Sequence, residues 1–331
     1  MKVSVKQIRQ QMHDVLTARE YSQLDIDFII DMFLGGELSG HITHGLATFA
    51  NFVNKDWSNL ENPEVIKQTS ALYLLDAKSN PGVAVGRQAA DEAIKRAKTE
   101  VIGIAIVKNM EIWLRPGGIA KYIANQGYLA IVINDAAGAA IAPPGGYDPT
   151  LGTNPIAYGL PMGDKPLVVD LATSKMAWGQ VRLANKYGTD LPADTFYDNE
   201  GNITLDPKKA HSIKPFGDHK GYALALLIEV LCGSLIGKAM MVTDSVKNSF
   251  VSQPADRVGV IFVIDPSQTV GLEAFSQNNA DLIERIKASS SLEGQSIRIP
   301  GEKAGELEAE AYEKDEVELP DGLWEEIKAI E

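Results

Sequence analysis

The sequence predicts an α/β fold with helical segments at both chain ends. In the middle of the chain, short apolar runs typical of covered strands alternate with helical stretches. Both ends show the spacing of amphipathic helices instead. With 331 residues, 45% of them hydrophobic, the chain can form one large or two ordinary domains, each with a buried core.

The N-terminal part, up to about residue 70, is expected to be helical. Helices are predicted over residues 5–18 and from Ser22 to about Phe33, and Ser22 and Asp25 are spaced like a capping box. Three glycines that follow are expected to break the second helix: Gly35, Gly36 and Gly40.

A third helix is predicted from about Gly45, because four apolar residues then repeat near the helical period: Leu46, Phe49, Phe52 and Val53. His44 therefore lies at a helix start, where backbone N–H groups point outward. A histidine in that place can serve as a proton donor. The alternative is a histidine that only hydrogen-bonds locally at the helix start.

Apolar runs in the middle of the chain predict strands of a covered sheet: residues 71–75, 101–108, 128–133, 167–171 and 258–264. Helices are expected between and after them: residues 85–98, 118–125, 220–235, 282–288, 306–313 and 321–330.

Charge and cysteine content narrow the class of protein. The formal net charge is −13, so a polyanion would be repelled and nucleic acid is not an expected partner. The single cysteine, Cys232, has apolar neighbours and is expected to be a buried structural thiol. Without an apolar signal-peptide core or an uninterrupted membrane-length apolar run, the chain is expected to be cytoplasmic and not bound to a membrane.

Several common site motifs do not occur in the sequence. No two glycines are separated by a single residue, so the Gly-x-Gly start of the common dinucleotide fingerprint is missing and an ordinary Rossmann site is not expected. The glycine-rich phosphate loop and the Gly-x-Ser-x-Gly esterase motif are missing too. His41 and His44 form a lone pair three residues apart, too few ligands to predict a metal site.

Three further polar clusters could form a site. Residues 152–155 form a tight turn, and residues 170–174 follow a strand with small hydroxyl side chains; each alone is typical of turn chemistry. Gly217-Asp218-His219-Lys220-Gly221 precedes a long apolar helix, which places Lys220 and free amides where they could hold an anion such as a pyrophosphate. A solvated helix start is the alternative.

In order and spacing, these clusters resemble the malate/L-lactate/sulfolactate dehydrogenase family over nearly the whole chain. The matching motifs are Thr43-His44-Gly45, Gly152-Thr153-Asn154-Pro155-Ile156, Val169-Asp170-Leu171-Ala172-Thr173-Ser174 and Pro215-Phe216-Gly217-Asp218-His219-Lys220-Gly221-Tyr222. Two stretches are similar to the 2,3-diketo-L-gulonate reductase branch of the family: Trp113-Leu114-Arg115-Pro116-Gly117 and Phe196-Tyr197-Asp198-Asn199-Glu200-Gly201-Asn202.

The resemblance implies a non-Rossmann mixed-sheet α/β cofactor domain, residues 71–299, and a helical domain built from residues 1–70 and about 300–331. It also implies a homodimer that uses NAD(P)H, with NADH slightly favoured, to reduce a 2-oxo acid or 2-oxo sugar acid. By similarity His44 is the proton donor. The implied cofactor contacts are Lys165, Pro166, Leu167, Val168, Val169, Asp170, Leu171, His219, Lys220, Gly301, Glu302 and Lys303.

Substrate recognition departs from the family pattern. Arg115 is the local candidate for binding a carboxylate, because its planar guanidinium suits that group. The family usually has an arginine where this chain has Thr48, on the substrate side of the site, and a histidine where it has Ile112. Two hypotheses follow: an active reductase with an altered substrate, or a dinucleotide-binding dimer that has lost catalysis and acts as a sensor or scaffold.

Overall fold

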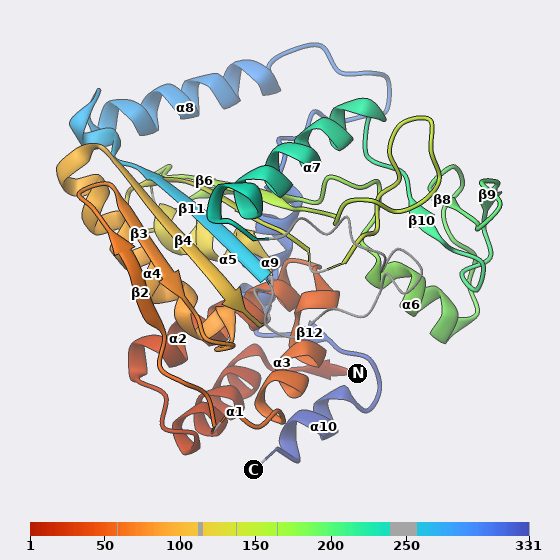
Figure 1. The fold of residues 1–331 in the computed structure, drawn as a ribbon, viewed down its shortest axis with the longest axis horizontal. Helices are drawn as coiled ribbons and strands as arrows, with labels where there is room; N and C mark the ends of the chain where they lie inside the picture. The colour runs from red at the N-terminus through yellow and green to blue at the C-terminus, as the bar shows by residue number, and fades with distance from the viewer. Residues whose placement is uncertain (58, 112–114, 137, 164, 239–256, 331) are drawn as a thin grey trace.

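A seven-stranded mixed sheet forms the centre of the protein (Figure 1). The structure, a computed structural model, describes residues 1–57, 59–111, 115–136, 138–163, 165–238 and 257–330. The strands lie in the order β2 (Glu64–Gln68), β3 (Leu72–Asp76), β4 (Ile102–Met110), β11 (Arg257–Ile264), β5 (Leu129–Asn134), β6 (Ile156–Leu160) and β7 (Leu167–Leu171). In this sheet β3 and β4 pair in parallel and the other neighbours are antiparallel. This confirms the mixed, non-Rossmann α/β fold, since a Rossmann sheet is mostly parallel.

Two helices pack closely on one face of the sheet: α4 (Gly82–Glu100) and α5 (Pro116–Ala124). Glycines in the strands permit this approach. A Cβ on Gly103 of β4 would lie 1.9 Å from the Ala93 carbonyl oxygen, and one on Gly159 of β6 would lie 2.3 Å from that of Ala120. The opposite face carries α7 (His219–Cys232), and Cys232 is buried there with strand residues, as the sequence predicts.

Segments from both chain ends form a helical layer against the sheet, and most of it lies below the sheet in Figure 1. Its members are α1 (Val5–Ala18), α2 (Gln23–Leu38), α3 (Leu46–Val53) and α10 (Leu323–Lys328), together with α9 (Glu302–Lys314), which contacts both α2 and β7. The short strands β1 (Lys2–Val3) and β12 (Val317–Glu318) pair antiparallel and join the two ends. One hydrophobic cluster runs from this layer into α4, β3 and β4. The division into residues 1–70 with 300–331, and 71–299, stays a prediction.

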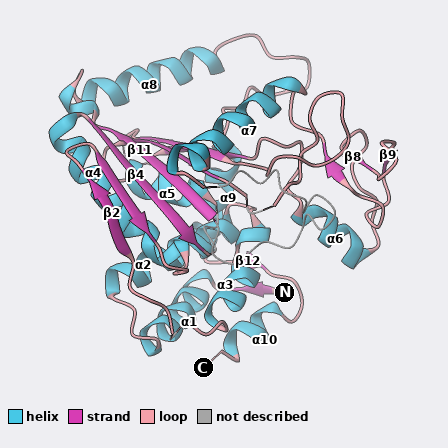
Figure 2. Ribbon diagram, viewed as in Figure 1, coloured by secondary structure: helices cyan, strands magenta, loops and turns pink. Residues whose placement is uncertain are grey.

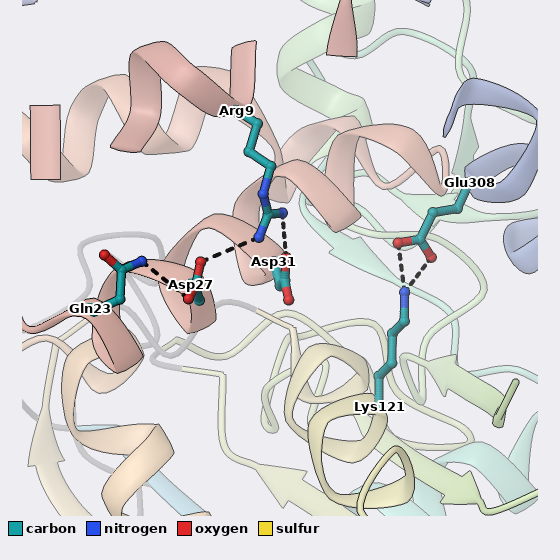
Figure 3. A network of polar contacts seen from close by, with 6 residues as sticks. All are labelled: Arg9, Gln23, Asp27, Asp31, Lys121 and Glu308. Carbon is teal, nitrogen blue, oxygen red and sulfur yellow. Dashed lines mark hydrogen bonds and ion pairs between the residues drawn. The ribbon is translucent and has the colours of Figure 1, made fainter. Parts of the chain in front are cut away.

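Ion pairs tie elements of this layer together and to the sheet (Figure 3). Arg9 of α1 lies 2.8 Å from the Asp31 carboxylate of α2. Lys121 of α5 donates to both carboxylate oxygens of Glu308 of α9, at 2.6 and 2.7 Å. The second pair fixes α9, near the end of the chain, against the helix that covers β6 and β7.

A smaller region lies at the side of the molecule (Figure 2). It contains α6 (Gly179–Tyr187) and a three-stranded sheet of β10 (Ser212–Ile213), β8 (Phe196–Tyr197) and β9 (Ile203–Thr204). The remaining elements are α8 (Leu272–Lys287) and short 3-10 helices at Ile42–His44, Ser234–Ile236 and Pro266–Gln268. The stretch His219–Ile236 is long and apolar enough to cross a membrane by length and composition alone, a test that a core helix of a soluble protein also passes.

Most predicted helices and strands are confirmed, with two corrections. Gly35 and Gly36 do not break α2, which continues to Leu38 and ends before Gly40. Their lack of a side chain permits close packing instead, because a Cβ on Gly36 would lie 2.8 Å from the His44 carbonyl oxygen. The helix expected at 282–288 begins ten residues earlier, at Leu272, and β2, β6 and α6 were not predicted.

Candidate functional site

A cavity of about 610 Å³ lies where β7, α5 and α9 meet. One wall is the β7 strand, from Pro166 to Leu171. The start of α5 and the segment that follows α2 form a second wall, which includes His41, Arg115, Gly117 and Lys121. The third wall is the segment from Arg298 to Glu308. Side chains and backbone from three distant parts of the sequence therefore face one space.

The α9 helix begins directly against β7. Gly301, its N-cap, has a φ of +85°, and a Cβ there would lie 2.0 Å from the Val168 carbonyl oxygen. Only glycine fits this left-handed position at that distance. The first backbone N–H groups of a 13-residue helix thus lie at the cavity wall, an arrangement that favours an anion such as a pyrophosphate.

Arg115 and Asp170 lie buried at the same cavity, each with a side chain 9% exposed. Arg115 Nη1 is 3.7 Å from Asp170 Oδ2, and the same oxygen accepts the Gly117 N–H at 3.1 Å. Burial raises the pKa of Asp170, and the Arg115 charge opposes that rise. Among the described residues, nothing accepts a hydrogen bond from Arg115 Nε. A buried guanidinium in a cavity wall can bind a carboxylate.

Backbone hydrogen bonds hold the segment that carries the two histidines. The His41 N–H donates to the Gly36 carbonyl and the His44 N–H to the His41 carbonyl, both at 2.8 Å. At the other end, the buried Glu37 carboxylate accepts the Leu46 N–H at 2.9 Å and so caps α3. The position of His44 is thus fixed by α2 on one side and by α3 on the other.

Threonines on both sides of His44 complete its surroundings. Thr43 Oγ1 lies 2.9 Å from His44 Nδ1, which leaves Nε2 for another partner. Thr48 Oγ1 donates to the Thr43 carbonyl at 3.0 Å. Burial, with the nearby Arg115 charge second, lowers the pKa of His44 to about 4. His44 is therefore neutral at pH 7 in the free protein.

The structure brings together some of the predicted cofactor residues and not others. Residues 166–171 and 301–303 share the cavity with Arg115. Lys165 is exposed just before β7 and is not among the described residues that line the cavity. His219 and Lys220 are exposed at the start of α7, which lies just beyond β7: a Cβ on Gly221 would lie 2.6 Å from the Thr173 carbonyl oxygen.

The structure also shows where other residues singled out in the sequence lie. Asn154 is fully buried; its Oδ1 accepts the Ala136 N–H at 3.1 Å and its Nδ2 donates to Glu229 at 2.8 Å, which ties the turn before β6 to α7. His41, which the sequence offered only as a weak metal ligand, lines the cavity beside Arg115. Ile112, Trp113 and Leu114 lie outside the described residues.

Comparison with known proteins gives this site its class. The chain is 32% identical to the L-sulfolactate dehydrogenase of Methanocaldococcus jannaschii, over 96% of this chain and 92% of that protein. It is 30% identical to the malate/(S)-sulfolactate dehydrogenase of Methanothermus fervidus, over 100% and 97%, and 27% identical to the 2,3-diketo-L-gulonate reductase of Klebsiella pneumoniae over the full length of both. These relatives are dehydrogenases and reductases, and the fold and site are those of an oxidoreductase that acts on CH–OH groups.

The structural comparison agrees with the sequence comparison. The M. jannaschii sulfolactate dehydrogenase structure superposes with a TM-score of 0.85, covering 100% of this chain and 96% of that one at 28% identity. The Pyrococcus horikoshii malate dehydrogenase structure gives a TM-score of 0.84, covering 100% and 94% at 26% identity. The family model described as malate/L-lactate dehydrogenase matches residues 3–328, and the chain belongs to that family.

Proposed function

We propose that the protein uses NAD(P)H to reduce a 2-oxo acid or 2-oxo sugar acid, such as 2,3-diketo-L-gulonate, to the 2-hydroxy acid. The observation that carries this proposal is the buried Arg115, which lines the same cavity as the start of α9. One anion-binding group suits a substrate carboxylate and the other a dinucleotide phosphate. Relatives named for sulfolactate, malate and diketogulonate support an acid of this class.

A nicotinamide dinucleotide fits the residues around the cavity. The tight contact of Gly301 with Val168 keeps the wall free of side chains, and the start of α9 supplies N–H donors. Residues 165–171 and 301–303 would hold the dinucleotide, with His219 and Lys220 at the start of α7 as further contacts. A bound reduced nicotinamide supplies the hydride for the carbonyl carbon. NADH is slightly favoured over NADPH.

His44 is the proposed proton donor. Because Thr43 Oγ1 contacts Nδ1, Nε2 is the nitrogen available to the substrate oxygen. As negative charge grows on that oxygen, the protonated ring neutralises it, and in the oxidation direction the neutral ring takes the proton back. Burial and, second, the Arg115 charge lower the His44 pKa, and phosphate and carboxylate charges bound near Arg115 would offset the effect of that charge. Arg115 would hold the carboxylate, and Thr48 would support the substrate side by anchoring Thr43.

The proposal includes a homodimer in the cytoplasm. After Lys220, α7 exposes no charged side chain in its described part, because Glu229 is buried, and it exposes Leu226, Leu227 and Val230. In a chain with net charge −13, an uncharged apolar face is the surface on which two copies meet with least repulsion. The buried thiol of Cys232 is typical of a reducing compartment.

A substrate panel tests the proposed function. Purified protein is assayed with 2-oxo acids and oxidised sugar acids, each with NADH and with NADPH. Turnover that saturates with one acid is expected, and it would dispose of the sensor or scaffold alternative. No turnover with any acid, combined with dinucleotide binding by calorimetry, would favour that alternative instead.

A further inference from the structure

His41 lies beside Arg115 and Asp170 in the wall of the cavity, three residues before His44. We propose that His41 is a second contact for the substrate carboxylate, one that takes up a proton when the acid binds. The inference rests on the proposed function and names a specificity residue for it. His41 would then carry a positive charge that depends on pH, a role that the sequence patterns did not indicate.

Hydrogen bonding at Ser39 sets which His41 nitrogen can reach a ligand. Ser39 Oγ lies 2.5 Å from the Gly35 carbonyl oxygen, and its single hydrogen is donated there. Ser39 Oγ can then only accept at His41 Nδ1, 3.1 Å away, so the hydrogen of the neutral ring is on Nδ1. Nε2 is left for the cavity, and it becomes a donor when the ring is protonated.

Burial and the neighbouring charges disfavour the protonated form of His41 in the free protein. Burial lowers its pKa and Arg115 lowers it further, while Asp170 and a backbone hydrogen bond at Ser39 oppose both. The other carboxylates in the cavity wall have partners of their own: Glu308 pairs with Lys121, and Glu302 accepts the Ile299 N–H and pairs with Lys287. Of the remaining charged groups in the wall, Arg298 lies 4.0 Å from Glu306 and Lys303 is exposed; His44, next along the segment, is itself held neutral.

A second cation would supply positive charge that this site otherwise lacks. Asp170, 3.7 Å from Arg115, offsets part of the guanidinium charge, and Thr48 has no charge to add. A carboxylate bound between Arg115 and His41 would remove the like-charge repulsion between them. Its negative charge would then favour the protonated form of His41. Affinity for the acid should therefore be higher at lower pH, by linkage.

Oxamate, an unreactive 2-oxo acid analogue, tests this without turnover. Binding is measured by calorimetry with NADH present, from pH 6 to 8.5, in two buffers of different ionisation enthalpy. Wild-type protein should take up as much as one proton per oxamate, with affinity falling by up to about tenfold per pH unit. His41→Gln should bind oxamate more weakly at pH 6, with less proton uptake and a weaker pH dependence than wild type; the uptake that remains belongs to His44.

Two other variants make the result specific. His44→Asn should keep the part of the proton uptake that belongs to His41, and His13→Gln, a change on α1 outside the cavity wall, should behave as wild type. No oxamate binding by wild type, no proton uptake, or uptake as large in His41→Gln as in wild type would each overturn the proposal. If proton uptake depends on His41 while the substrate panel gives no turnover, the proposed function fails and this inference stands. If the panel gives turnover while proton uptake does not depend on His41, the proposed function stands and this inference fails.

Discussion

Gly36 of α2 lies directly against the backbone of His44. A Cβ at position 36 would come within 2.8 Å of the His44 carbonyl oxygen and 3.5 Å of Arg115 Nε. The His41 N–H also donates to the Gly36 carbonyl, at 2.8 Å. Gly36 therefore sets the spacing between α2, the two histidines and Arg115, the residue proposed to bind the substrate carboxylate.

Gly36→Ala is expected to reduce turnover without unfolding the protein. The added methyl must push the His44 backbone away, and a displacement of about 1 Å at a reacting group can cost roughly 10²-fold. Helix propensity alone favours alanine by about 1 kcal/mol, so α2 should persist. Gly35→Ala is the matched control, because its Cβ would meet only ordinary contacts at 3.6 and 3.7 Å. Equal kcat in the two variants would contradict the assigned role of Gly36.

His44→Asn tests the proton donor. Asparagine keeps a similar size and some hydrogen bonding but cannot deliver a proton, so kcat should fall by roughly 10²–10⁴. Cofactor affinity should barely change, and the melting temperature should stay close to that of wild type because Glu37, which accepts the Leu46 N–H and caps α3, remains in the variant. Turnover within about threefold of wild type would exclude His44 as the donor.

The lowered pKa of His44 predicts a loss of stability in acid. Its folded pKa of about 4 lies below the ordinary histidine pKa of 6.5, so between these pH values the unfolded chain binds more protons. The free energy of unfolding should fall as pH drops through that window, by at most about 3 kcal/mol from this group. This fall in the free energy of unfolding is measured by urea denaturation at pH 7 and at pH 4.5.

The His44→Asn variant isolates this contribution. Asp135, whose pKa burial raises to about 6, acts in the opposite direction, and His41 acts in the same direction as His44. Both remain in the variant, so the difference between the two proteins reports His44. An equal pH dependence in wild type and variant would show that His44 is not held neutral.

Lys220→Ala should weaken dinucleotide binding more than substrate binding. Lys220 lies exposed at the start of α7, where its charge can hold a phosphate; the free amides that the sequence predicted are not found there, because the N–H groups of Lys220 and Gly221 donate to the Gly217 and Phe216 carbonyls. The Kd for NADH should rise severalfold and should become less sensitive to salt, while oxamate affinity at saturating NADH stays near the wild-type value. Lys98→Ala, an exposed change at the end of α4, is the control. An unchanged Kd for NADH would remove Lys220 from the site.

Leu227→Asp tests the proposed dimer surface. Leu227 is 53% exposed on α7, and an aspartate there would place a desolvated charge in the interface of both copies. Light scattering at micromolar concentration should give a dimer mass for wild type and a monomer mass for the variant. Leu292→Asp, at a position 71% exposed and outside α7, should remain dimeric. A wild-type monomer would contradict the dimer itself.

Local patterns in the sequence predicted the helices and strands that are marked by an apolar face or by a capping residue. Ser22 accepts the Asp25 N–H, as the capping box predicts, and the run at 167–171 is β7. By contrast, β2 is exposed at every residue, so it has no apolar alternation to reveal it. The start of α8 was missed for the same reason, because no described residue of that helix is buried.

The site depends on contacts between distant residues, which local spacing does not encode. Nothing near Gly301 indicates that it packs on Val168, and only the family resemblance pointed to it. From sequence alone, Gly35 and Gly36 predict a helix break. Only the structure shows that the His44 backbone packs directly against Gly36. His41 likewise gained significance only when Arg115 and Asp170 were found beside it.

The pairing of β1 with β12 has a consequence for synthesis on the ribosome. Lys2 and Glu316, which hydrogen-bond at this junction, are 314 residues apart. At about 5–20 residues per second, α1 and α2 emerge roughly 15–60 s before α9 and α10 can cover them. During that interval a nascent chain exposes the apolar faces of its first helices, so this family member should be a client of chaperones that bind early nascent chains. The cavity wall at Gly301 also forms late, and a dinucleotide held there could bind only after α9 has been synthesised.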